Sequence, residues 1–302
     1  MQSNRSLLAR LINDYPVVLF SALAIGFSWT VWIATFSITT PRSGLGMLGI
    51  VLGAFGPGVA GAVVTRLRGE SVRAWLSTIF DWRRPLRWYG LAIAVPVVGA
   101  IGVAVVVFSL VGLPDSSSLR QLAPWFLFNL VLATLFTGGN EEFGWRGFAL
   151  PHLQKRFSAL TASVLIGGVW VLWHVPMFVY GVYQLSPLLY AASVVSFAVI
   201  LTWYYNASDG AVLGAVLFHG IINATVNVPG RAVGGAATVP VPYAAILTGV
   251  FGILALLLVA RYGPETLSHR EAVRPRWTVS RRSDASVSGS PSSDGHATEP
   301  SD

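Results

Sequence analysis

Three polar segments interrupt otherwise apolar stretches of this sequence, and their residue types are those that activate water. The first segment contains adjacent glutamates, the second a single histidine, and the third a histidine and an asparagine: Glu141, Glu142, His174, His219 and Asn223. A carboxylate or an imidazole can act as a general base, and imidazole or amide N–H groups can stabilise an oxyanion. Together these residues supply the kinds of groups that an enzyme needs to hydrolyse its substrate.

The spacing in the first segment suggests a division of labour between its two glutamates. If this segment is helical, Glu142 and Arg146 lie four residues apart on one face, within reach of an ion pair. Glu141 then points about 100° away from that pair. We therefore expect Glu142 and Arg146 to hold the local structure, and Glu141 to be the carboxylate available as a general base. The alternative is a juxtamembrane cytoplasmic turn whose charges are solvated.

The two histidine segments also have structural alternatives. His174 lies in an apolar stretch just before Pro176, and a lone histidine there could be a hydrogen-bonded packing residue. His219 and Asn223 lie four residues apart, so a helix presents both on one face, and Gly220 between them allows another helix to approach closely. Such a pair could serve only to hold helices together.

The same residues could also hold zinc, because two histidines and a carboxylate with one open position are a known catalytic set. If a metal binds, its ligands are Glu141, His174 and His219. The sequence contains no cysteine and no H-E-x-x-H motif, so neither a thiolate site nor an ordinary zincin site is available. The residues permit a zinc enzyme and equally permit one without a cofactor.

The elements that must position these residues are membrane helices. The chain of 302 residues is 54% hydrophobic and only 11% charged, and its mean hydropathy is +0.63. Its apolar runs approach or exceed the roughly 20 residues that cross a bilayer. Eight can be drawn: 16–36, 46–64, 88–113, 123–137, 159–180, 187–205, 211–226 and 241–260. We predict an all-α, polytopic membrane protein with about eight transmembrane helices.

The arginines predict an orientation in the cell membrane. Most lie before the first run, between the second and third runs, or after the last, which predicts cytoplasmic N- and C-termini. Nucleic-acid binding is not indicated, because these arginines set membrane orientation. The stretch 71–87 is predicted to be an amphipathic helix at the interface. Residues 1–262 form the expected transmembrane domain, and the polar composition of 263–302 predicts a disordered cytoplasmic tail.

In their order along the chain, Glu141-Glu142-x-x-x-Arg146, an aromatic residue followed by His174, and His219-x-x-x-Asn223 resemble the CPBP family, the Abi or type II CAAX prenyl endopeptidase group. The resemblance implies an eight-helix fold whose site opens to the cytoplasm or the bilayer. It implies that Glu141 activates water with help from His174, while His219 and Asn223 stabilise the oxyanion. Glu142 and Arg146 match accompanying positions. Trp170 departs from the family, which usually has phenylalanine there.

The expected function is an intramembrane endopeptidase that hydrolyses a membrane-associated peptide or protein, by a glutamate or a metal mechanism. One alternative is a non-catalytic membrane partner or immunity-type protein that uses the polar cluster for helix association. A proton-relaying transporter is less consistent, because no internal repeat is evident. The sequence does not indicate the substrate, whether the substrate is prenylated, or where it is cleaved. It also does not indicate the oligomeric state.

Overall fold

The helices predicted from the apolar runs are present in the computed structural model, which describes residues 7–277. Among these residues, seven helical stretches are long and apolar enough to cross a membrane. They are α2 (Pro16–Ile38), α3 with α4 (Gly44–Ala54, Gly56–Leu67), α6 (Leu86–Val111), the stretch Ser116–Leu153 that begins with α7 (Ser116–Leu135), α12 (Pro187–Ala207), α13 with α14 (Val212–Thr225, Val228–Ala232) and α15 (Tyr243–Tyr262). The all-helical, polytopic prediction is confirmed.

The eighth predicted span is shorter than the others. Helix α10 (Ala159–Trp173) ends at His174, and the short helix α11 (Val175–Val179) follows with Pro176 in its first turn. Proline cannot donate a backbone hydrogen bond and its ring crowds the carbonyl four residues earlier, so the α10 hydrogen-bond pattern cannot continue through Pro176. His174 therefore lies at a helix junction within the apolar stretch.

Side-chain caps begin several of the helices. Ser43, Ser71, Ser158 and Ser186 each accept a hydrogen bond from a backbone N–H of the helix that follows. Asp115 does so twice at the start of α7, accepting from the backbone of the next turn at 2.8 Å. Short polar side chains satisfy N–H groups that a helix start leaves unpaired. The predicted fourth run therefore begins earlier than hydropathy alone suggested.

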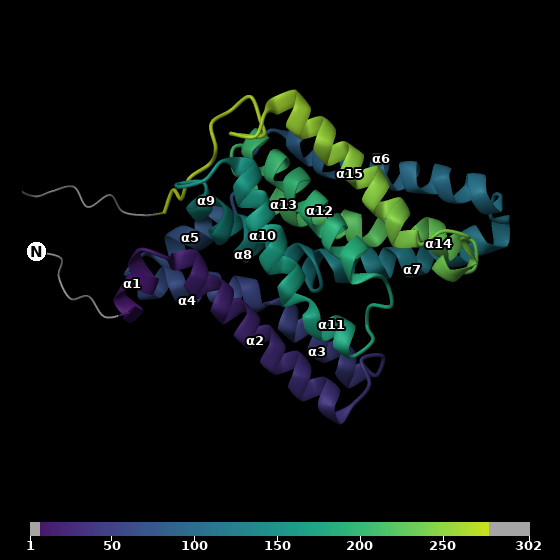
Figure 1. The fold of residues 1–302 in the computed structure, drawn as a ribbon, viewed down its shortest axis with the longest axis horizontal. Helices are drawn as coiled ribbons and strands as arrows, with labels where there is room; N and C mark the ends of the chain where they lie inside the picture. Colours follow the sequence, from purple (N-terminus) through teal and green to yellow (C-terminus); the bar gives the residue numbers. More distant parts are fainter. Residues whose placement is uncertain (1–6, 278–302) are drawn as a thin grey trace, which may run out of the picture.

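Helices α12 and α13 lie at the centre of the molecule (Figure 1). Helix α12 packs between α10 and α15, while α13 packs against α6 and α7. Helix α2 packs against α3 and α4, and this group lies beside α11 on the side away from α15. The residues predicted to do chemistry are therefore carried by the most enclosed helices and their neighbours.

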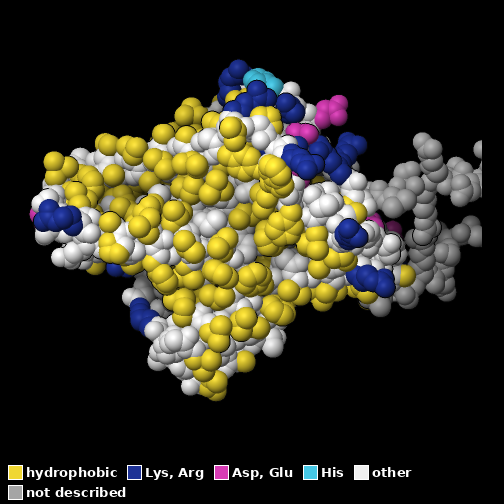
Figure 2. Space-filling model, turned by 180° about the vertical axis from the view of Figure 1, so that it is seen from behind, with side chains coloured by type: hydrophobic (Ala, Val, Ile, Leu, Met, Phe, Trp, Pro, Cys, Tyr) yellow, Lys and Arg dark blue, Asp and Glu magenta, His cyan; other side chains and the backbone are white. Residues whose placement is uncertain are grey.

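The outer surface has an apolar band and a basic end. Figure 2 shows hydrophobic side chains over most of the visible face, with arginines gathered toward the end where the grey termini leave. At this end lie the short helices α1 (Leu7–Asn13) and α5 (Val72–Ile79), and the segment after α15. An apolar band between charged ends is the surface expected of a membrane-spanning protein. We call this the arginine-rich end; its cytoplasmic location stays a prediction.

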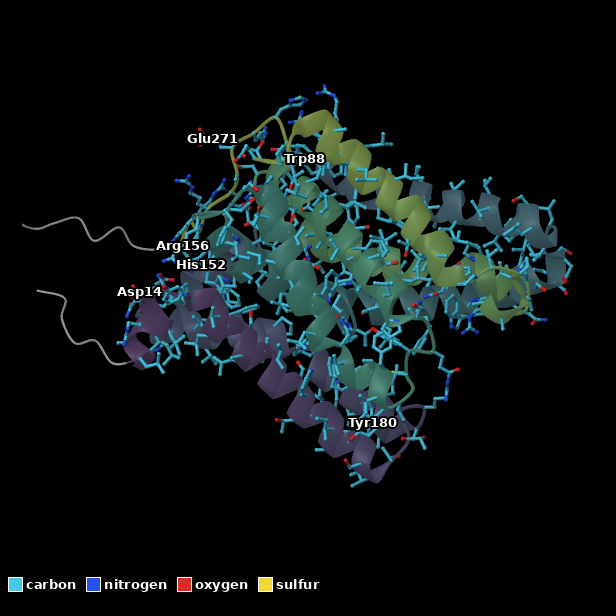
Figure 3. All side chains as sticks on the ribbon, in the orientation of Figure 1. Asp14, Trp88, His152, Arg156, Tyr180 and Glu271 are labelled. Atoms are coloured by element: carbon cyan, nitrogen blue, oxygen red, sulfur yellow. The ribbon has the colours of Figure 1, made fainter. Side chains whose placement is uncertain are left out.

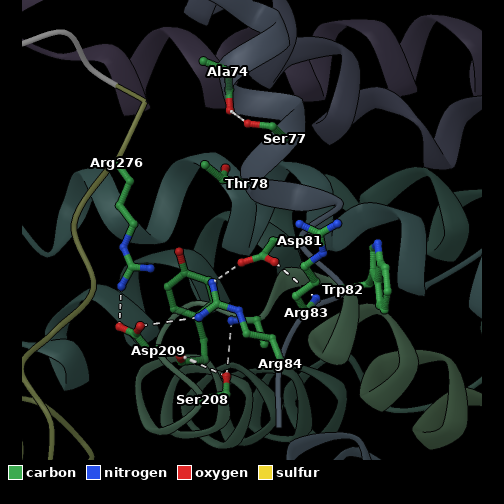
Figure 4. Close-up of polar contacts among 12 residues, drawn as sticks. Ala74, Ser77, Thr78, Asp81, Trp82, Arg83, Arg84, Ser208, Asp209 and Arg276 are labelled. Atoms are coloured by element: carbon green, nitrogen blue, oxygen red, sulfur yellow. Dashed lines mark hydrogen bonds and ion pairs between the residues drawn. The ribbon is translucent and has the colours of Figure 1, made fainter. Parts of the chain in front are cut away.

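Ion pairs join three separate connections at the arginine-rich end (Figure 4). Arg84 contacts Asp81 at 2.8 Å and Asp209 at 3.4 Å, and Asp209 also pairs with Arg276. The α5–α6 connection, the α12–α13 turn and the segment after α15 are therefore held against one another. Of the predicted amphipathic stretch 71–87, α5 is helical and its Trp75 is buried, residues 80–85 are not helical, and α6 begins at Leu86.

The predicted tail begins too early at residue 263. Residues 263–277 pack on the body of the protein: Leu267 is fully buried, and the Gln154 side chain donates to the carbonyl of Val273 at 2.8 Å. The Asn206 side chain donates to another carbonyl of this segment, and Trp277 donates to Glu70 at 3.1 Å. Composition missed this because a few buried apolar residues and two buried amides anchor an otherwise polar segment. Residues 278–302 lie outside the described part of the chain.

Candidate active site

The segment that carries the glutamates is helical but irregular. It runs through a 3₁₀ turn (Gly139–Glu141), a short α-turn α8 (Glu142–Gly144), a π-helical turn (Trp145–Ala149) and α9 (Leu150–Leu153). Such π-helical turns are rare and often occur at functional sites. Here the irregular path turns Glu141 and Glu142 toward different neighbours.

Glycines allow this segment to lie directly against other helices. A Cβ atom at Gly138 would collide with the side-chain nitrogen of Asn223, and one at Gly144 would collide with the backbone of Pro57 in α4. On α13, a Cβ atom at Gly220 would collide with Thr134 in α7. Close backbone approach therefore places the glutamate segment beside the His219–Asn223 face of α13.

Glu142 is the centre of a fully buried polar cluster. Arg146 contacts Glu142 Oε2 at 2.9 Å and Oε1 at 3.1 Å, so the predicted ion pair is present. The guanidinium also donates to the carbonyl of Ala198 in α12 at 3.3 Å. In addition, His219 Nδ1 lies 2.8 Å from Glu142 Oε1. A carboxylate paired with arginine accepts, so Nδ1 carries the hydrogen and the second ring nitrogen of His219, Nε2, faces other partners.

Glu141 is held separately from that cluster. Its Oε2 accepts a hydrogen bond of 2.9 Å from the indole N–H of Trp170 in α10. Trp170 also makes an edge contact with His219, at 5.1 Å between ring centroids, and its ring lies 5.5 Å from the guanidinium carbon of Arg146. The sequence identified Trp170 only as an aromatic substitute for phenylalanine, whereas its donor group contacts the proposed base directly.

His174 is oriented by the end of its own helix. Its Nδ1 lies 2.9 Å from the carbonyl oxygen of Trp170, which can only accept, so Nδ1 carries the hydrogen. In the neutral ring, Nε2 is then an acceptor. The rings of Tyr183 and Tyr190 lie 5.7 and 5.5 Å from the imidazole. These two tyrosines, which sequence reasoning did not single out, form an aromatic wall around His174.

Asn223 is held more loosely than the other three residues. Its side-chain nitrogen donates to the backbone carbonyl of Thr137 over 3.4 Å. The backbone carbonyl of Asn223 accepts from the side chain of Asn129 over 3.5 Å. Both distances are at the long end for hydrogen bonds. The Asn223 amide can therefore change partner at small energetic cost.

One cavity brings the four predicted catalytic residues together. Glu141, His174, His219 and Asn223 all line a cavity of about 920 Å³, although they come from three separate parts of the chain. Glu142 and Arg146 are not among its lining residues and lie behind Glu141 and His219. The division predicted between a free glutamate and a structural glutamate therefore matches their positions.

The connections that line the rest of this cavity lie away from the arginine-rich end. They are the α11–α12 connection, including Gln184 and Ser186, and the α14–α15 connection from Ala236 to Pro242. Figure 1 shows α11 and α14 on the side of the molecule remote from α1, α5 and α9. These connections and the arginine-rich end therefore lie at opposite ends of the cavity-bearing helices, and the side of the membrane that each end faces stays a prediction.

The donors for a metal are not gathered in this arrangement. Within residues 7–277, no three histidine or acidic side chains are arranged to hold a metal ion. The zinc set considered from the sequence, Glu141, His174 and His219, is therefore not gathered as a metal site in the part of the chain that the structure describes.

Comparisons with known proteins agree with this geometry. The profile of the family described as "Type II CAAX prenyl endopeptidase Rce1-like" matches residues 123–225, and this range includes the four residues predicted to be catalytic. The chain is also similar to CAAX prenyl protease 2 of Methanococcus maripaludis, with 29% identity over 214 residues, or 63% of this chain and 75% of that protein. Residues 123–225 of this chain therefore match the Rce1-like type II CAAX prenyl endopeptidase family, and the longer alignment is with a CAAX prenyl protease.

Proposed function

We propose that this protein is an intramembrane endopeptidase in which Glu141 activates the attacking water. The match to this family supports an endopeptidase with a protein substrate. The observation that carries the mechanism is the single cavity, lined by a carboxylate, two imidazoles and an amide, inside apolar helices. Polar groups at such depth are costly and are retained where they have a partner or a use.

Water activation is assigned to Glu141 and His174. The Trp170 bond occupies Oε2 of Glu141, which leaves Oε1 to accept a hydrogen bond from water. His174 Nε2 is the second acceptor, because Nδ1 is committed to a backbone carbonyl. A water that donates to both would keep its lone pairs for the substrate carbonyl carbon, and Glu141 would take the proton as attack proceeds.

Stabilisation of the tetrahedral oxyanion is assigned to His219 and Asn223. Nδ1 of His219 is engaged with Glu142, so its other ring nitrogen, Nε2, is the atom that can donate to the oxyanion when it carries a hydrogen. The loosely held amide of Asn223 supplies the second donor. Oxyanion donors of this kind typically contribute about 10² to 10³ in rate each.

The substrate is proposed to be a membrane-associated peptide or protein. The cavity combines its polar residues with a larger apolar lining from α12 and α15, which suits a peptide with an apolar portion. The similar protein from Methanococcus maripaludis is named a CAAX prenyl protease. A prenylated peptide is therefore the first substrate to compare with its unmodified form.

The test is hydrolysis of quenched fluorescent peptides, prenylated and unmodified, by the purified full chain. Glu141→Gln keeps the shape of the side chain but removes its basicity, so we expect a loss of about 10² to 10⁴ in rate. Glu271→Gln is the matched control, because Glu271 is an exposed carboxylate far from the cavity (Figure 3). It should retain activity.

Two outcomes would overturn the mechanism. If Glu141→Gln cleaves as fast as wild type, Glu141 is not the base. If chelator abolishes cleavage and zinc restores it, a metal mechanism replaces the one proposed. If neither protein cleaves any peptide or any protein of native membranes, the non-catalytic membrane partner becomes the better interpretation.

A further inference from the structure

A second hollow lies beside α10, apart from the catalytic cavity. It has a volume of about 520 Å³ and lies between the start of α2 and the first half of α10. Trp145 and Ile166 are buried at its base, whereas Val18 and Leu165 are exposed along its sides. It is therefore a groove in the apolar surface, and it shares no lining residue with the catalytic cavity.

The groove has cations at one end and apolar residues at the other. Its charged lining residues are Arg68, Lys155 and Arg156, against a single carboxylate, Asp14. Arg68 already pairs with Glu70 at 3.0 Å, whereas Lys155 and Arg156 form no ion pair within residues 7–277. Figure 3 shows Asp14 and Arg156 near one another at the arginine-rich end. The cationic end therefore lies where a lipid headgroup would be.

The cations outnumber the carboxylates at this end. The Arg156 guanidinium carbon lies 5.4 Å from the ring centre of Tyr15, over the start of α2. Burial and the neighbouring Arg68 lower the pKa of Lys155 from its ordinary value; Glu70 opposes this shift, while Arg156 and Arg274 add to it. Crowded cations of this kind favour an anion between them.

The length of the groove fits one leaflet of a bilayer. Its apolar lining on α10 reaches Val169, ten residues beyond the start of the helix at Ala159. That separation is about 15 Å at 1.5 Å per residue, or half of the roughly 30 Å hydrocarbon core. A molecule with an anionic head and one apolar chain of this length would satisfy both ends of the groove.

We propose that this groove is a specific site for an anionic phospholipid, with its phosphate between Lys155 and Arg156 and one acyl chain along α10. A free phosphate would use only the cationic end and leave the apolar part exposed. A neutral lipid would fill the apolar part and leave the cations unmatched. The proposed lipid site is separate from the proposed hydrolysis, because the groove and the catalytic cavity share no lining residue and the cations Lys155 and Arg156 line only the groove.

The experiment is native mass spectrometry of the purified full chain with phosphatidylglycerol or with phosphatidylcholine of the same acyl chains. Wild type should retain phosphatidylglycerol preferentially. The double variant Lys155→Gln, Arg156→Gln should lose about 25-fold in that preference, since one cation near an anionic lipid contributes about fivefold. Val18→Trp fills the groove and should weaken binding of both lipids. Glycerol phosphate should not displace the bound lipid.

The matched control is Arg87→Gln, which removes an exposed cation from the same end of the molecule but outside the groove. A general surface potential would make its effect equal to that of Arg156→Gln, and that result would overturn the proposal. Equal retention of both lipids by wild type would also overturn it.

A second measurement needs no substitution, because Lys155 is the only lysine in the chain. An amine-reactive reagent can therefore modify only Lys155 and the amino terminus. In vesicles that contain phosphatidylglycerol, modification of Lys155 should fall relative to the amino terminus, compared with vesicles of phosphatidylcholine alone. An equal fall at both amines would contradict a specific site.

Discussion

Removing the hydrogen bond from Trp170 to Glu141 should have an effect that can be estimated in advance. Phenylalanine is the natural replacement, because the family that the sequence resembles usually has phenylalanine at this position. Trp170→Phe keeps an aromatic ring but removes the indole N–H that lies 2.9 Å from Glu141 Oε2. A hydrogen bond to a charged group typically contributes about 1.5–3 kcal/mol. We expect its loss to destabilise the fold by that amount, in addition to the cost of the smaller ring.

Trp173→Phe is the matched control for the smaller ring. Trp173 lies on the same helix and is equally buried, but its indole nitrogen has no hydrogen-bond partner within residues 7–277. Both substitutions therefore create a similar cavity, and only one removes a hydrogen bond. The difference between the two free energies of unfolding isolates the Trp170–Glu141 interaction.

The assay is reversible unfolding in mixed micelles, applied to a double-mutant cycle of Trp170→Phe and Glu141→Ala. The coupling energy should be about 1.5–3 kcal/mol, because each single substitution removes the same bond. Hydrolysis by Trp170→Phe should fall about 10-fold to 100-fold, as expected when about 1.4–2.7 kcal/mol of positioning is lost. A coupling energy near zero, with Trp170→Phe as active as Trp173→Phe, would refute this reasoning.

Three further predictions concern the buried cluster, the helix contact and the orientation. Glu142→Gln should destabilise the protein by about 3–5 kcal/mol in the same unfolding assay, because it leaves the guanidinium opposite it without a buried counter-charge. Gly220→Ala should cost about 1–3 kcal/mol, since the added methyl group meets Thr134; unchanged stability would show that α7 and α13 can separate freely. In intact cells, a cysteine introduced at Gln184 should react with an impermeant thiol reagent, and one introduced at Ser77 should react only after the membrane is opened. The reverse pattern would show that the termini face outward.

The irregular glutamate segment has a physical interpretation. In a regular α-helix, the side chains of adjacent glutamates point about 100° apart, and this fixed angle limits which neighbouring groups the two carboxylates can contact. The 3₁₀ and π-helical turns around Glu141 and Glu142 change that spacing, so one carboxylate meets Trp170 and the other meets Arg146 and His219. Two like charges can then lie close together, because each has its own donors.

Much of the architecture could be predicted from local pattern. Apolar runs of sufficient length located the membrane helices, because a helix is the only single segment that satisfies its own backbone in hydrocarbon. The spacing of Glu142 and Arg146 predicted their ion pair, because residues four apart on a helix are neighbours whatever surrounds them.

The partners of the site residues could not be predicted in this way. His219 contacts Glu142, and Trp170 contacts Glu141, across 77 and 29 residues of sequence. Which side chains meet over such separations depends on helix packing, and the packing depends here on glycines such as Gly220 that admit a neighbouring backbone. No local pattern encodes that meeting.

By itself, then, the sequence determined a helical membrane protein, the residue types of its candidate site and the ion pair between Glu142 and Arg146, because those properties depend on hydropathy and helical spacing. Only the tertiary structure decided that three segments share one cavity, that Trp170 donates to Glu141, and that residues 263–277 fold back onto the body. Each depends on groups that are remote in sequence and are brought together by packing, where a buried polar atom must find its partner.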